Sequence, residues 1–195
     1  NTLFPTQLVQ NVLLGGGGTA TNITFNGGPG NIMSEQLGSF DGTTSIVGLD
    51  GGLIMATGSI QAALGPNDSG GYSEGGGNFD VANSDPDLAL LSGVTNFDKA
   101  VLEFDFVPTG DSLKFRYVFS SEEYDEYVCG TVNDAFGFFL SGPGFNGPFS
   151  NNAVNIALVP GTQIPVSINT VNSGLVGANG TESNCSDLDP NWETN

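Results

Sequence analysis

The chain has 195 residues, of which 3 are basic and 21 acidic; its formal net charge is −18 and it contains no histidine. This charge repels phosphate backbones and anionic lipid headgroups, so we expect no nucleic-acid partner and no membrane insertion. Without histidine, a Ser-His-Asp triad, a His-ligated zinc site and a histidine pH switch are all excluded. Apolar residues make up 38% of the chain and include 14 phenylalanines, which is enough for a folded core rather than a disordered acidic segment.

Short alternating or apolar runs, separated by Gly, Asn and Pro, predict an all-β protein with a few short helices. The first half predicts a helix over residues 5–14, strands over 22–25, 45–48 and 53–57, and a helix over 86–91. The second half predicts a hairpin of 100–107 with 112–119, a helix over 122–128, and strands over 135–141, 154–159 and 165–171. We expect one domain over residues 1–195, arranged as a β-sandwich or jelly roll.

The expected hairpin is the most specific of these elements, because two criteria select the same register. A turn at 108–111 places Asp105 opposite Lys114 and Glu103 opposite Arg116. The same alignment stacks aromatic and aliphatic side chains on the other face of the hairpin.

The two cysteines, Cys129 and Cys185, allow one disulfide, which would close a loop of about 56 residues. The alternative is a pair of free, buried thiols. The low lysine content, the acidity and the many Asn, Gly, Ser and Thr residues are typical of secreted proteins. We therefore favour the disulfide and an extracellular or cell-surface location.

Clustered carboxylates suggest a calcium site, since Ca²⁺ prefers several oxygen ligands. The expected ligands lie in one dense group and one smaller group: Glu122, Glu123, Asp125, Asn133 and Asp134, and Asp85 with Asp87. No EF-hand spacing is present, so this prediction depends on clustering alone. The alternative is a solvated acidic edge, with Asp85 acting as a helix N-cap.

Four Asn-x-Ser/Thr sequences match the N-glycosylation pattern, at Asn22, Asn67, Asn179 and Asn184. A pair among the four carboxylates at 122–126 is also a candidate acid/base pair for glycoside hydrolysis. Adjacent residues rarely face each other across a substrate, and the chain has one tryptophan for sugar stacking. A hydrolase is therefore the least favoured function.

Several segments together resemble the choice-of-anchor L domain of secreted and surface proteins in Bacteroidota-type bacteria. The most specific blocks are FDFVPTGDSLKFRYVFSSEEYDEYV (104–128) and NDAFGFFLSGPG (133–144). Further similarity lies in FPTQLVQNVLLG, GLIMATG, DPDLALL, NIALVPGT and VSINTVN. The resemblance covers nearly the whole chain and implies an extracellular β module without a known catalytic role, so no active-site residue is carried over.

The family pattern continues with further strands beyond the segment around Trp192, and we expect those C-terminal strands to be missing here. Either the chain is only part of the domain, or the missing edge is supplied by another molecule, because a sandwich without these strands exposes unpaired backbone that a strand from a neighbouring copy would satisfy. We therefore expect a structural or adhesive surface module that polymerises head-to-tail with copies of itself into a filament. The alternative is a calcium-dependent module that binds surface glycans.

Overall fold

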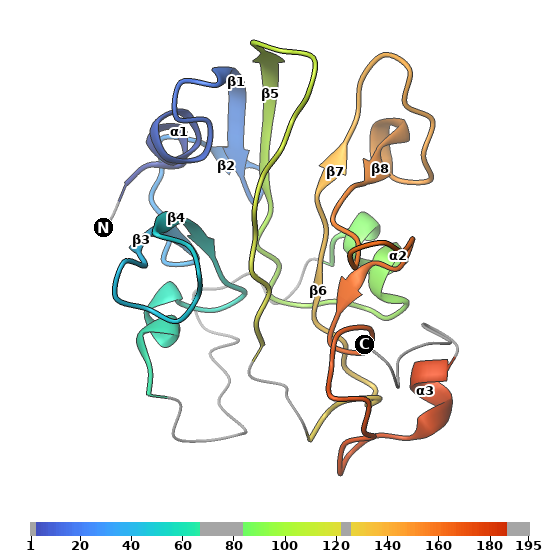
Figure 1. The fold of residues 1–195 in the computed structure, drawn as a ribbon. Helices are drawn as coiled ribbons and strands as arrows, with labels where there is room; N and C mark the ends of the chain where they lie inside the picture. Colours follow the sequence, from blue (N-terminus) through green and yellow to red (C-terminus); the bar gives the residue numbers. More distant parts are fainter. Residues whose placement is uncertain (1–2, 67–83, 122–125, 187–195) are drawn as a thin grey trace. The chain divides into compact units, whose positions relative to one another are not determined.

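The computed structural model describes residues 3–66, 84–121 and 126–186 (Figure 1). The chain forms two compact units, each described below by itself. Among the described residues, unit 1 holds 3–66 and 98–118, and unit 2 holds 84–97, 119–121 and 126–186. Small antiparallel sheets and a few short helices make up both units, which confirms a mostly β protein. The sandwich or jelly-roll arrangement and the single domain remain predictions.

Unit 1 contains a three-stranded antiparallel sheet in the order β2-β1-β5 (Figure 1). Its strands are β1 (Gly18–Phe25), β2 (Gly28–Pro29) and β5 (Leu102–Pro108). A two-residue turn joins β1 to β2, and both its residues, Asn26 (φ 48°) and Gly27 (φ 75°), have the left-handed backbone that such turns require. The predicted strand over 22–25 is thus confirmed as the end of a longer strand.

The predicted hairpin of 100–107 with 112–119 is not formed as a β-ladder: β5 pairs with β1, and residues 112–119 belong to no strand. Thr21 lies opposite Asp105 in that ladder. The Asn22 side chain donates a 2.7 Å hydrogen bond to Asp105, and Arg116 donates to the carbonyl of Gly48 at 2.8 Å. The partners expected from local charge pairing are therefore replaced by partners from distant parts of the chain.

The core of unit 1 forms where the N-terminal helix meets two sheets. Helix α1 (Pro5–Gln7) continues as a π-helical segment (Leu8–Leu13), so the helix predicted over 5–14 is confirmed. Leu8, Phe25 and Leu37 are buried together, on three different elements. Leu37 belongs to β3 (Leu37–Asp41), which the sequence patterns did not predict and which pairs with β4 (Gly51–Met55).

The predicted strand over 45–48 is wrong: this segment belongs to the loop that joins β3 to β4. Ser45 donates from its backbone N–H and its hydroxyl to the Gly42 carbonyl, and its Oγ accepts from the Val47 N–H. Side-chain bonds of this kind compete with strand pairing. A 3₁₀ helix (Ile60–Leu64) with Ser59 as its N-cap follows β4.

Unit 2 begins with α2 (Pro86–Ser92), which confirms the helix predicted over 86–91. The Asp85 carboxylate accepts from the backbone N–H groups of Asp87 and Leu88, at 3.0 and 3.1 Å. Proline at the first helical position and Gly93 at φ 74° complete the two ends.

The remaining strands of unit 2 are two residues long and form two-stranded pairs. β6 (Ala135–Phe136) pairs with β9 (Val166–Ser167), and β7 (Phe139–Leu140) pairs with β8 (Val154–Asn155). The strands predicted over 135–141, 154–159 and 165–171 are confirmed in place but are shorter. A short 3₁₀ segment (Ser150–Asn152) precedes β8, and α3 (Glu182–Ser186) follows later. The helix predicted over 122–128 lies mostly outside the described residues.

Candidate functional site

The Cys129–Cys185 disulfide lies at the centre of the unit 2 core. Its Cα atoms are 5.0 Å apart, and it links residues separated by 56 positions. Both cysteines are fully buried and pack with Val128 and Ile168. The covalent link therefore occupies the position that large apolar side chains hold in an ordinary core.

Two asparagine side chains hold the backbone around this disulfide. Asn169 is buried, and its Oδ1 accepts from the Cys129 N–H at 2.8 Å. Asn184 donates from Nδ2 to the carbonyls of Cys129 and Gly130, at 2.9 and 3.1 Å. The Thr181 N–H also donates to the Cys129 carbonyl. Residues 177–184 are thereby fastened against residues 126–130.

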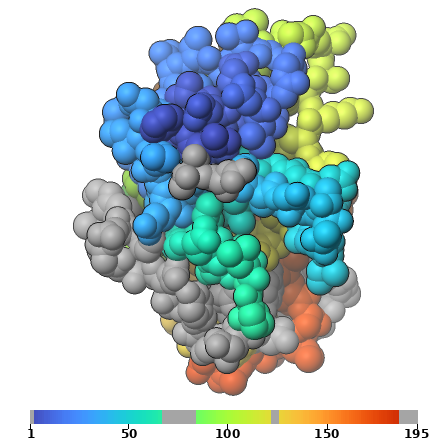
Figure 2. Space-filling model, turned by 90° about the vertical axis from the view of Figure 1, so that its left-hand side faces the viewer, coloured from blue at the N-terminus to red at the C-terminus, as the bar shows by residue number. Residues whose placement is uncertain are grey.

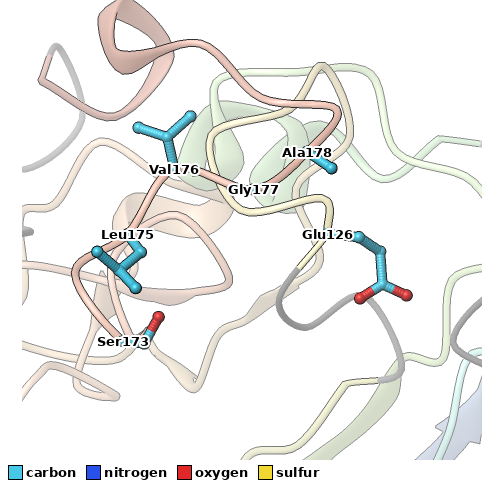
Figure 3. A pocket seen from close by; sticks show the side chains of 6 residues that line it. All are labelled: Glu126, Ser173, Leu175, Val176, Gly177 and Ala178. Carbon is cyan, nitrogen blue, oxygen red and sulfur yellow. The ribbon is translucent and has the colours of Figure 1, made fainter.

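An open pocket of about 350 Å³ lies beside this fastened segment (Figure 3). Its lining consists of one acidic residue and a short run of small or aliphatic residues: Glu126, Ser173, Leu175, Val176, Gly177 and Ala178. Leu175 is 70% exposed and Val176 39% exposed. The described lining thus offers an aliphatic wall and the Glu126 carboxylate, which suits an apolar group accompanied by a positive charge.

Backbone hydrogen bonds keep the two sides of the pocket together. The Gly177 N–H donates to the Val128 carbonyl at 2.9 Å, and the Asn179 N–H donates to the Glu126 carbonyl at 2.9 Å. The pocket is therefore formed before any ligand binds, as small-molecule and side-chain pockets usually are.

Glycoside hydrolysis needs two carboxyl groups on either side of a bond. Among the described residues that line the pocket, Glu126 is the one carboxylate. The other candidates for this chemistry, Glu122, Glu123 and Asp125, lie outside the described residues, so the described pocket does not supply an acid/base pair.

The smaller group of predicted calcium ligands is engaged in hydrogen bonds with the protein. Asp85 caps α2, as described above, through Oδ1. Asp87 accepts from the backbone N–H and the hydroxyl of Ser150 through its Oδ1, at 2.9 and 3.1 Å. Both carboxylates therefore have structural partners in unit 2.

Asn133 and Asp134 occupy different environments although they are adjacent. Asn133 is buried; its Nδ2 donates to the Ser92 carbonyl at 2.9 Å, and its Oδ1 accepts from the Asn169 N–H at 3.1 Å. Asp134 is exposed and accepts from the Ser121 hydroxyl at 2.8 Å. Asn133 thus bridges the end of α2 and the segment after β9.

In the described ranges 3–66, 84–121 and 126–186, no group of three or more His, Cys, Asp or Glu side chains is arranged to hold a metal ion. Glu122, Glu123 and Asp125 lie outside these ranges, so the calcium site stays a prediction.

The predicted glycosylation positions differ in how their amides are used. Asn22 is exposed at φ 52° and donates to Asp105, whereas Asn179 is exposed on a turn. Asn184 uses its Nδ2 for the two carbonyls beside the disulfide, so a glycan there would remove one N–H donor and at least one of these bonds. Asn67 lies outside the described residues.

Sequence reasoning missed the structural role of Asn169 and the pocket at 173–178. The sequence does carry a signal for the role of Asn169: this residue follows an alternating apolar run, where a buried polar side chain needs a hydrogen-bond partner. The pocket has no local sequence signal, since its walls come from two segments about 50 residues apart in the chain.

A model of the choice-of-anchor L domain matches residues 1–193. The chain belongs to the choice-of-anchor L family. Comparison with curated proteins and with solved structures finds no match. Membership identifies this chain as a surface-associated bacterial protein module, from a family that is not a family of enzymes. Among the described residues of this choice-of-anchor L domain, no helix has the length and apolarity needed to cross a membrane.

Proposed function

We propose that this choice-of-anchor L domain is a structural or adhesive module of an extracellular assembly, in which copies of the chain associate head-to-tail. The observation that carries the proposal is the buried disulfide and the asparagine bonds around it. Small secreted domains use such covalent links where the apolar core alone is modest. In unit 2 the backbone of residues 126–128 and 177–179, next to the link, also forms an exposed pocket, which supports a role for this surface in association.

An edge strand supports association through strand complementation. The sheet of unit 1 ends on β5, and no described residue pairs with the outer edge of that strand. Edge strands with free backbone groups accept a strand from another molecule. A contact that joins two different surfaces of the same chain passes from copy to copy, and it builds a filament where its rotation does not close into a ring.

Calcium binding by Glu122, Glu123 and Asp125 together with Asp134 is the second part of the proposal. Four carboxylates within five residues repel each other unless a cation lies between them. The described partner of Asp134, the Ser121 hydroxyl, leaves its other oxygen available to a cation.

The test of the assembly is sedimentation velocity on the oxidised full chain over a concentration series, with negative-stain electron microscopy of the same samples. We expect polymers that lengthen with concentration. A monomer at every concentration, with the disulfide formed, would refute head-to-tail association. A glycan array separates the alternative, a glycan-binding module, because an assembly module binds no member of the array.

A further inference from the structure

The loop between β3 and β4 presents two branched aliphatic side chains to solvent. Ile46 is 104% exposed and Val47 is 42% exposed; we call this pair the aliphatic knob. Figure 2 shows the light-blue to cyan segment that contains it at the surface of unit 1. Exposed aliphatic side chains are favourable contacts for a partner that removes them from water.

Hydrogen bonds fix the loop that carries the aliphatic knob. The Gly42 N–H donates to the Asp50 carbonyl at 3.0 Å, which closes the base of the loop. Ser45 bonds to Gly42 and Val47, as described above, and Arg116 donates to the Gly48 carbonyl at 2.8 Å. A loop that is already ordered loses little conformational freedom when it binds.

The pocket of unit 2 is complementary to the aliphatic knob in polarity. It is open, it is lined by Leu175, Val176 and Ala178, and the one carboxylate among its described lining residues is Glu126. The knob is convex and aliphatic, and a cation, Arg116, lies against its loop. The chain has only 3 basic residues, so the placement of one beside the knob gives this loop a polarity unlike the rest of the acidic surface.

We propose that the aliphatic knob of one copy docks into the unit 2 pocket of the next copy, with Arg116 facing Glu126 of the neighbour. This contact rests on the proposed head-to-tail association and replaces strand addition at the edge of β5 as the contact that produces it. Knob and pocket are different surfaces, so each copy uses one of each and the contact propagates. A lipid surface is a poorer occupant for the knob, because a chain of charge −18 is repelled by anionic headgroups.

The first experiment uses two single variants of the full oxidised chain, Ile46→Asp and Leu175→Asp. Each places a charge in the proposed contact, and we expect each to weaken self-association by roughly tenfold or more in sedimentation velocity. A mixture of the two variants retains one intact knob and one intact pocket. We therefore expect the mixture to form a one-to-one dimer that does not grow further.

Leu64→Asp and Ile32→Asp are the matched controls, since these aliphatic side chains are 79% and 61% exposed outside the proposed contact. They should polymerise like the unchanged chain. Thermal melts of all four variants check that each one folds.

A charge exchange tests the polar part of the contact independently. Arg116→Glu and Glu126→Arg should each reduce association, and the two substitutions in one chain should restore part of it. The inference is overturned if the double variant does not recover association and the Ile46→Asp and Leu175→Asp variants assemble like the unchanged chain. That result leaves head-to-tail association in place. A chain that stays monomeric without any substitution overturns both, and one that binds only vesicles assigns the knob to a membrane and overturns the inference.

Discussion

Removing the disulfide by the double substitution Cys129→Ala and Cys185→Ala should destabilise the chain strongly. The link closes a loop of 56 positions, and the chain-entropy model gives a loss of about 4 kcal/mol at 25 °C. In a chain of 150–250 residues, each kcal/mol lowers Tm by about 2–4 °C. The expected decrease is therefore about 8–16 °C. Alanine is preferred to serine at both positions because both side chains are fully buried and a hydroxyl would need a new partner.

Circular dichroism melts of the oxidised chain and of the double variant measure this decrease. Reductant should lower the Tm of the unchanged chain toward that of the variant and leave the variant unaffected, which separates the disulfide from other effects of reduction. A decrease below about 4 °C in the double variant would refute the reasoning, because the asparagine bonds and the surrounding core would then be sufficient without the link.

Four further predictions concern single interactions. Asn133→Ala should cost about 2–4 kcal/mol in urea unfolding, because it leaves the buried Ser92 carbonyl and the Asn169 N–H unpaired; a cost under about 1 kcal/mol would contradict this. Asp85→Ala should cost about 1 kcal/mol and Asp85→Asn much less, since asparagine also caps helices; equal costs would argue against capping. Hydrogen bonds from the backbone N–H and then from the hydroxyl of Thr43 lower the pKa of Asp41. The stabilisation by the ionised Asp41 is therefore present above the ordinary carboxyl pKa and is lost as pH falls through the lowered value. Thr43→Val should raise the Asp41 pKa in an NMR titration, and an unchanged titration would reject the bond from the hydroxyl. If calcium binds the folded chain, a chelator should lower Tm, by the equivalent of about 2.7 kcal/mol at a concentration of 100 Kd; an identical melt would reject the calcium site.

Local signals were sufficient where a single segment determines its own structure. Helix α2 is readable from Asp85, the proline that follows it and Gly93, because a cap, a fixed φ and a left-handed terminus all act within nine residues. The alternation in β5 was likewise visible, and its outward residues are the exposed ones.

Pairing between distant segments was not readable. Asp105 and Lys114 have opposite charges and a plausible turn between them, yet Asn22, 83 positions away, provides the partner for Asp105. One sequence does not show which of two alternating segments is the neighbour. The strand predicted over 45–48 was wrong because of a local interaction. The β-branched residues of this segment favour a strand, but the side chain of Ser45 bonds to the nearby backbone and holds the segment in a loop.

The candidate site follows the same division. Two cysteines leave only a single disulfide or two free thiols to choose between, whereas the pocket walls at Glu126 and at 173–178 become neighbours only after folding. The buried amides of Asn133 and Asn169 were only partly predictable. The sequence indicates that a buried amide needs hydrogen-bond partners, but it does not identify those partners.

The disulfide also determines how unit 2 responds to mechanical force. A pull transmitted through the chain from the C-terminal side enters at Cys185 and passes directly to Cys129, so the segment between them carries no tension. Without the link, that segment could unravel by about 190 Å before the force reached residue 129. In a module of a surface assembly exposed to fluid shear, the pocket wall at residues 173–178 would therefore carry no tension, whereas Glu126 on the other wall lies outside the linked segment.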